Sequence, residues 1–125
     1  MIKLLLLISI ALLTEFSFAA IIKSAKLDDS KKNIIIEVEY SGGCKKHDFS
    51  IQLTPCSRSH PAQCSAELID KTQDDHCEAY ITTTIIIALA QYKLSDPAFK
   101  NATLTINGDI NKSTNKVSNV SVKLP

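Results

Sequence analysis

Cysteines and histidines that lie close together are the residues of this chain best suited to chemistry. Four cysteines and three histidines occur, and six of these seven residues form the short groups Cys44-x-x-His47, His60-x-x-x-Cys64 and His76-Cys77. Thiolate and imidazole are the usual ligands of zinc, so a zinc-binding periplasmic protein is one interpretation. However, no two ligand pairs have the spacing of a structural zinc site, and adjacent residues of a strand point to opposite faces. We therefore expect disulfides rather than a metal, and no cofactor.

The four cysteines can form three different sets of two disulfides. We predict the nested set, Cys44 with Cys77 and Cys56 with Cys64, because it needs no crossing connection, and the other two sets remain open. In the chain-entropy treatment, a closed loop of roughly nine residues contributes about 2.6 kcal/mol and one of roughly thirty-four residues about 3.8 kcal/mol. Either value is a large share of the stability of a small domain.

His47 is the histidine whose position suggests a defined role. It is in phase with Phe49, Ile51 and Leu53, so we expect its side chain to face the core near the start of a strand. There it would hydrogen-bond a carbonyl or carboxylate beside a disulfide and fasten the turn that Gly42 and Gly43 begin. The chain has no Gly-x-Ser-x-Gly, no His-Glu-x-x-His and no phosphate-binding glycine loop, so we assign no catalytic residue. A small hydrolase outside the cytoplasm remains an alternative.

Residues 1–19 have the pattern of an export signal. Lys3 precedes an apolar run from Leu4 to Leu13, and Ser17-Phe18-Ala19 places small residues where a signal peptidase cleaves. The run is far shorter than the ~20 residues that span a bilayer. We therefore expect a signal peptide over 1–19, one domain over 20–125, and no transmembrane segment after cleavage. The expected location is the periplasm or the outside of a bacterial cell, where disulfides persist.

Alternating apolar and polar residues predict the strands that position the cysteines and His47. β-branched residues and turn signals every eight to twelve residues predict strands over 34–40, 49–53, 64–68, 77–83, 85–90, 103–110 and 117–124. Asp96-Pro97 predicts a single helical turn, with aspartate as its N-cap. This pattern predicts an all-β fold: an antiparallel β-sandwich, or a small barrel, of about seven strands braced by disulfides.

The charge pattern argues against nucleic acid and lipid as partners, while the loop 55–63 suggests a protein or glycan. The net charge is +1, and no block of five or six like charges occurs, so we expect neither nucleic acid nor lipid as a partner. The loop 55–63 carries Arg58 and His60 and would be tied down by the Cys56–Cys64 bridge. Loops on a rigid scaffold commonly bind ligands. We therefore predict a binding or inhibitor-like module that acts on a protein or glycan partner through Arg58 and His60.

Two runs of sequence carry a resemblance. Tyr-Ser-Gly-Gly-Cys-Lys-Lys-His-Asp-Phe over 40–49 and Asp-Asp-His-Cys-Glu-Ala over 74–79 resemble the Gly-Gly-Cys-x-x-His-x-Phe and Asp-x-Cys-Glu-Ala elements of small, uncharacterised secreted bacterial proteins. The resemblance covers 34–94, about half of the chain, and Cys56 and Cys64 belong to neither element. It implies export and a Cys44–Cys77 bridge. That family has no assigned activity, so the resemblance implies none for this chain.

Overall fold

The described part of the chain forms seven strands and two short 3-10 helices. The computed structural model describes residues 20–72, 74–111 and 113–125, so the predicted signal peptide lies outside the described residues. The elements are β1 (Ile21–Leu27), β2 (Asn33–Gly42), β3 (Phe49–Leu53), β4 (Gln63–Asp70), β5 (Ala79–Ala88), η1 (Leu89–Tyr92), η2 (Pro97–Phe99), β6 (Thr103–Asn111) and β7 (Lys116–Lys123).

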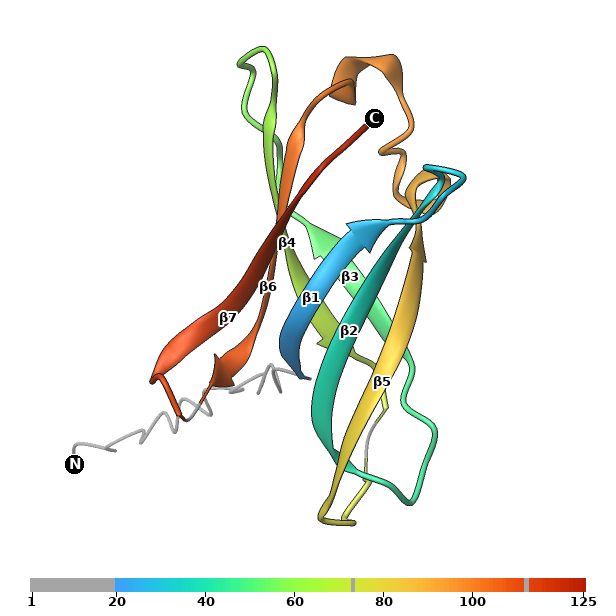
Figure 1. Ribbon diagram of the computed structural model, residues 1–125, viewed down its shortest axis with the longest axis vertical. Helices are drawn as coiled ribbons and strands as arrows, with labels where there is room; N and C mark the ends of the chain where they lie inside the picture. Colours follow the sequence, from blue (N-terminus) through green and yellow to red (C-terminus); the bar gives the residue numbers. More distant parts are fainter. Residues whose placement is uncertain (1–19, 73, 112) are drawn as a thin grey trace, which may run out of the picture.

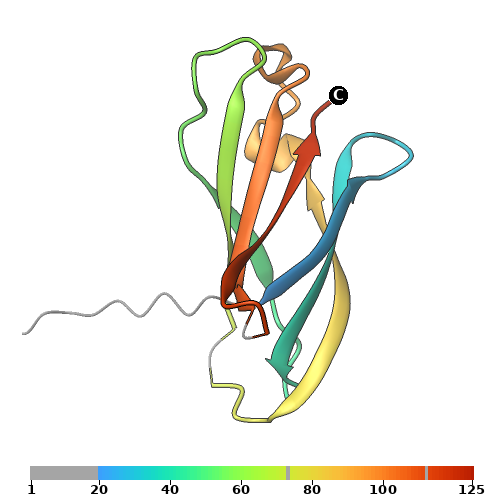
Figure 2. The same cartoon turned by 60° about the vertical axis from the view of Figure 1, so that its left-hand side comes forward.

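The strands form two sheets that pack face to face. One sheet has the order β1-β2-β5 and the other β3-β4-β6-β7, and Figures 1 and 2 show them as two layers. The predicted sandwich is confirmed, and the sheets do not close into a barrel. One pairing departs from the antiparallel expectation: β4 and β6 are parallel. The chain leaves β4, forms β5 in the opposite sheet and returns to β6, which is the crossover connection that a parallel pair requires.

Two strand predictions need correction. The segment 77–90, predicted as two strands, forms the single strand β5 and then turns into η1, whose Leu89 is buried. The seventh strand is instead β1, which the sequence pattern did not reveal. A register shift between Ile22 and Ser24 interrupts the alternation of β1, so its residues do not follow period two. The predicted helical turn is η2, where the Asp96 side chain accepts a hydrogen bond from the backbone N–H of Ala98.

The inward-facing residues of both sheets form one core. Ile34, Ile36 and Val38 of β2 have no exposed surface, which is the face that their alternation predicts. They belong to the same buried cluster as Leu104 and Ile106 of β6. Burial of this apolar surface is the main contribution to folding, and it fixes the face on which each neighbouring side chain of these strands lies.

The start of β1 closes one side of the sandwich against β6 and β7. The carbonyl of Ala20 accepts a hydrogen bond of 2.7 Å from the N–H of Asp109. The hydroxyl of Ser118 accepts from the N–H of Ile22 at 3.1 Å and donates to the carbonyl of Asp109 at 2.7 Å. A Cβ on Gly108 would lie 2.6 Å from the Ala20 carbonyl oxygen, so this close approach requires glycine.

Both predicted disulfides are present in the structure. Cys44, just after β2, is bonded to Cys77, just before β5, with their Cα atoms 5.6 Å apart. Cys56 and Cys64, with Cα atoms 4.3 Å apart, close the loop between β3 and β4. No cysteine is free. The nested set therefore closes one long and one short loop of the chain.

Removal of the two bridges should cost different amounts of stability. The Cys44→Ala/Cys77→Ala variant should lower the free energy of unfolding by about 3.8 kcal/mol, and Cys56→Ala/Cys64→Ala by about 2.6 kcal/mol, because the longer loop restricts the unfolded chain more. Urea unfolding followed by circular dichroism measures both losses. An equal loss in the two variants, or the reverse order, would contradict this account.

Candidate functional site

His47 connects two carboxylates at one end of the sandwich. Its side chain is 6% exposed and lies between β2 and β3. The ring Nδ1 is hydrogen-bonded to the carboxylate of Asp70, the last residue of β4, and Nε2 lies 2.6 Å from Oδ2 of Asp75, in the connection from β4 to β5. A single imidazole in the β2–β3 connection therefore joins the end of β4 to the connection from β4 to β5. This is the arrangement expected of a histidine that fastens a turn.

The Asp75 carboxylate is bound by the backbone of the opposite segment. It accepts hydrogen bonds from the N–H groups of Gly43, Cys44 and Lys45 at 3.0, 3.3 and 3.4 Å, and from that of Cys77 at 3.2 Å. Three successive N–H groups form a concave arrangement that suits an anion. The Asp75 side chain is only 3% exposed, so the chain itself supplies the anion for this arrangement.

The two glycines of this turn are required for different reasons. A Cβ on Gly42 would lie 2.5 Å from Oδ2 of Asp75 and 2.8 Å from Nε2 of His47, so any side chain would displace the network. Gly43 has a φ of +110°, in the left-handed region that favours glycine. The Gly-Gly pair therefore allows both the close approach and the change of direction.

The network favours a charged imidazole. Burial opposes the charged form, but the hydrogen bonds to Asp75 and Asp70 and the charges of both carboxylates outweigh it and raise the pKa of His47 above its ordinary value. The hydrogen bond from His47, together with the backbone N–H groups, lowers the pKa of Asp75 well below its ordinary range. The ring of Tyr40 packs against that of His47, with the two centroids 4.3 Å apart and the planes tilted by 34°.

The His47 cluster offers neither a free imidazole nitrogen as a base nor free thiolates as metal ligands. Both nitrogens of His47 are engaged with carboxylates, so neither is available as a base for a nucleophile. Among the described residues, Cys44, Asp75 and Cys77 are grouped with their potential ligand atoms within 4.8 Å of one another. The two sulfur atoms are joined in a disulfide and are not thiolates, which are the form that binds zinc. The cluster therefore acts as a brace for its end of the sandwich.

Sequence reasoning missed both carboxylates of this cluster. Asp70 and Asp75 bound a polar stretch that has no strand pattern, so nothing local to either residue indicates a histidine partner. A signal was present, however. The two sequence elements quoted above each contribute one partner, His47 from the first and Asp75 from the second, and the Cys44–Cys77 bridge joins the same two elements.

Arg58 and His60 lie far from this cluster. They belong to the loop between β3 and β4, and Figure 1 shows that loop at the end of the sandwich opposite to the β2–β3 connection. Both residues are exposed, as predicted for a surface loop. His76 is exposed beside Cys77, so the three histidines do not form one site.

The loop that carries Arg58 and His60 is a ring with its own hydrogen bonds. Across the ring, the N–H of Ser57 donates to the carbonyl of Gln63 at 2.9 Å, and the N–H of Gln63 donates to the hydroxyl of Ser57 at 2.9 Å. The Ser57 and Ser59 hydroxyls are 2.7 Å apart, and the Ser59 hydroxyl donates to the carbonyl of Pro61 at 3.1 Å. The His60–Pro61 peptide bond is cis. The hydrogen bonds and the bridge together fix the shape of the loop.

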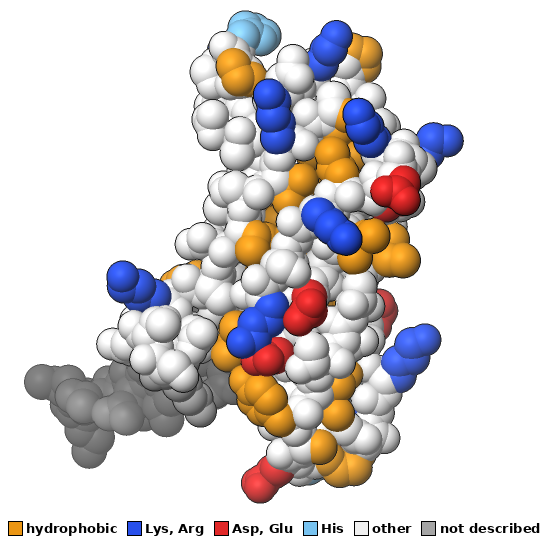
Figure 3. Space-filling view, viewed as in Figure 1, with side chains coloured by type: hydrophobic (Ala, Val, Ile, Leu, Met, Phe, Trp, Pro, Cys, Tyr) orange, Lys and Arg blue, Asp and Glu red, His pale blue; other side chains and the backbone are white. Residues whose placement is uncertain are grey.

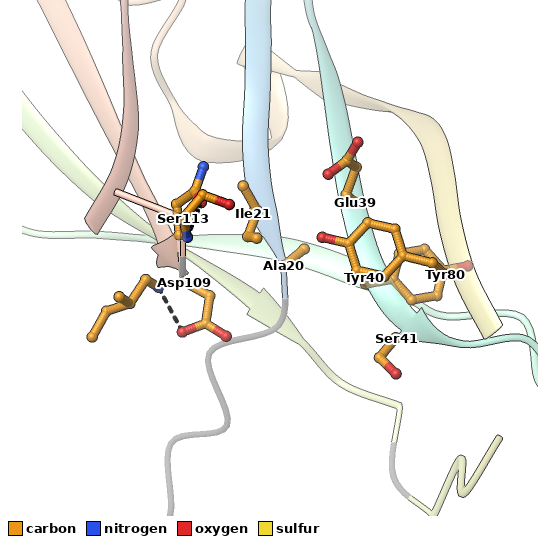
Figure 4. A pocket seen from close by; sticks show the side chains of 10 residues that line it. Ala20, Ile21, Glu39, Tyr40, Ser41, Tyr80, Asp109 and Ser113 are labelled. Atoms are coloured by element: carbon orange, nitrogen blue, oxygen red, sulfur yellow. Dashed lines mark hydrogen bonds between the residues drawn. The ribbon is translucent and has the colours of Figure 1, made fainter. Parts of the chain in front are cut away.

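A shallow hollow of about 330 Å³ lies beside the start of β1. Figure 4 shows Glu39, Tyr40, Ser41 and Tyr80 on one side of it and Asp109 on the other. The Glu39 carboxylate is paired with Lys23 at 3.1 Å, and Asp109 accepts from the N–H of Ile110 at 2.7 Å. The lining contains no histidine and no cysteine, and it includes none of the site residues that the sequence predicts.

Comparison of this chain with protein-family models, with curated protein sequences and with solved structures finds no match. Within the described ranges, no helix has the length and apolar character needed to cross a membrane.

The His47 cluster should make the free energy of unfolding depend on pH in both the acidic and the alkaline range. Because the folded-state pKa of His47 is raised, its contribution is complete below pH 6.5 and is lost as the pH rises through that folded-state pKa. Because the pKa of Asp75 is lowered, its contribution is present above pH 3.8 and is lost as the pH falls through its folded-state value. Urea unfolding at a series of pH values measures both.

The His47→Gln variant should lose the decline in stability at alkaline pH, because glutamine does not titrate. His76→Gln is the matched control, since that side chain is exposed and outside the network, and it should keep the decline. An alkaline decline of unchanged size in His47→Gln would show that another group causes it.

Proposed function

We propose that this protein is an exported binding module, inhibitor-like in design, that acts on a protein partner through the ring closed by Cys56 and Cys64. The observation that carries the proposal is that the Arg58 side chain is exposed and, among the described residues, unpaired on a fixed loop. Its side chain is exposed, and no described residue pairs with its guanidinium, although its neighbours on both sides are hydrogen-bonded within the ring. A cation held out from a fixed loop is a group available for a partner.

Preorganisation is the physical advantage of such a ring. A flexible loop loses conformational freedom when it binds, at a cost of about 0.5–1.5 kcal/mol for each immobilised side chain. Here the bridge and the bonds between Ser57 and Gln63 have already fixed the backbone. Below the ring, the N–H of Thr54 donates to the carbonyl of Ser65 at 2.9 Å and continues the ladder.

A protein partner suits this loop better than a glycan. The guanidinium of Arg58 has a planar fork of donors that matches a carboxylate. The ring sequence Cys-Ser-Arg-Ser-His-Pro-Ala-Gln-Cys contains no Phe, Tyr or Trp on which a sugar could stack. The zinc-binding and hydrolase alternatives have less support, because the cysteines are bridged and both nitrogens of His47 are occupied.

Export is part of the same proposal. Two disulfides and the apolar leader with its small-residue cleavage pattern both suit a compartment in which thiols oxidise. Mass spectrometry of the protein from its native cells should show an amino terminus at or beside Ala20 in the periplasmic or secreted fraction. Full-length protein that retains Met1 in the cytoplasmic fraction would contradict export.

Affinity capture tests the binding loop. The wild-type protein, immobilised through its carboxyl end, should retain a stoichiometric partner from periplasmic and secreted fractions, and Arg58→Ala/His60→Ala should lose it. Lys116→Ala/Lys123→Ala is the control, because it removes two exposed side chains of β7 and leaves the ring intact. Capture of the same partners by all three proteins, or of none, would remove this loop from the account.

A further inference from the structure

We infer that the ring is a substrate-like inhibitory loop for a serine protease of trypsin-like specificity, with Arg58 in the specificity pocket and the Arg58–Ser59 peptide bond at the catalytic serine. The inference rests on the proposed function and names the class of its partner. It is carried by three features of the ring: one anchored arm, a set of internal hydrogen bonds, and a single outward cation between small residues.

One arm of the ring is anchored on the core. Cys64 is 4% exposed and Ala62 is 7% exposed, and both belong to the buried cluster. The carbonyl of Ala62 accepts from the N–H of Thr103 at 3.0 Å, and Gln63 and Cys64 already pair with β6. The opposite arm, 57–60, is exposed along its whole length. The ring therefore projects one segment from a fixed base.

The hydroxyls on both sides of Arg58 are used inside the ring. Because the Ser59 hydroxyl donates its one hydrogen to the carbonyl of Pro61, the Ser57 hydroxyl is the donor between the two serines. The Ser57 hydroxyl also accepts from the N–H of Gln63. These bonds fix the residue on each side of Arg58. The Arg58 side chain takes no part, so it is free to enter a pocket.

The partner follows from this chemistry. A protease of trypsin-like specificity binds an arginine side chain in a deep pocket with a carboxylate at its base, and places the next peptide bond beside the nucleophilic serine. Serine on both sides of Arg58 keeps the segment narrow, as a cleft requires. In the view of Figure 3, basic and histidine side chains predominate at the upper end of the molecule, where the ring lies. Such a surface would not repel a negatively charged pocket.

Rigidity turns such a substrate into an inhibitor. Attack by the protease serine on the Arg58 carbonyl carbon forms an ester and releases the amino group of Ser59, which receives the proton from the catalytic histidine. The Cys56–Cys64 bridge and the hydrogen bonds keep that amino group beside the ester. Its return re-forms the peptide bond and frees the serine. Hydrolysis by one water instead leaves a carboxylate on Arg58 and an amino group on Ser59, both within one bridged chain.

Inhibition of purified trypsin and chymotrypsin by the folded, disulfide-bonded chain 20–125 tests the inference. Trypsin should be inhibited competitively and chymotrypsin spared. Arg58→Leu should weaken trypsin inhibition by about a hundredfold or more, because the carboxylate of the pocket is left buried without its partner. Arg58→Lys should retain inhibition, and Lys116→Ala, at the end of β7 that is far from the ring, should equal the wild type. Inhibition of trypsin that survives Arg58→Leu, or no inhibition by the wild type, would overturn the inference.

Cleavage provides a second readout. Prolonged incubation with trypsin should give a small fraction of chain cut only between Arg58 and Ser59, one water heavier and held together until reduction. Ser57→Ala, which removes the hydroxyl that links Gln63 to Ser59, should be cut faster and inhibit less. Rapid, complete cleavage of the wild type without inhibition would identify an ordinary substrate and overturn the inference.

The two proposals fail in different ways. If trypsin is not inhibited but a captured partner is still lost in Arg58→Ala/His60→Ala, the protease inference is wrong and the binding function stands. If neither inhibition nor ring-dependent capture is seen, both are wrong.

Discussion

The buried carboxylate of Asp75 is the constraint on which one end of this structure depends. A buried charge is costly unless several partners bind it, and here the imidazole of His47 and four backbone N–H groups do so. Those partners come from the turn after β2 and from the segment before β5, while the other nitrogen of His47 reaches Asp70 at the end of β4. The network therefore ties the two sheets together where the β2–β3 and β4–β5 connections meet. Gly42 has to be a glycine because this network occupies the space of its side chain.

The backbone is fixed at both ends of the sandwich, but by different kinds of interaction. At the His47 end, the side chains of His47, Asp70 and Asp75 are buried and satisfy one another. At the other end, neutral hydrogen bonds and a bridge fix the backbone, and the charged side chain is left outside. Strand β4 links them, because Cys64 near its start closes the ring and Asp70 at its end holds His47. Its inward residues Ala66 and Leu68 are buried, so the core sets the register that positions both ends.

The sequence predicts the parts of this architecture that depend on local pattern. Alternation in β2 and β3 predicts the buried faces, and nested spacing predicts the two bridges. The sequence does not predict strand β1, because a bulge interrupts its alternation. Its contacts in β6 and β7 also lie about a whole domain away along the chain. Asp75 escaped for a related reason: its acceptor role depends on N–H groups 30 to 32 residues away in the sequence. The bonds within the ring become visible only once the bridge closes it.

The ring separates the residues that maintain its shape from the residue that would choose its partner. Cys56, Cys64, Ser57 and Gln63 make every cross-ring contact described above, and each of those contacts would remain whatever side chain stood at position 58. Substitution at an exposed position without contacts changes stability by only about 0.5 kcal/mol or less. Specificity at this position is therefore decoupled from folding. Replacement of Arg58 by an apolar side chain would therefore suit a partner with a different specificity pocket, while the sandwich beneath the ring stays the same.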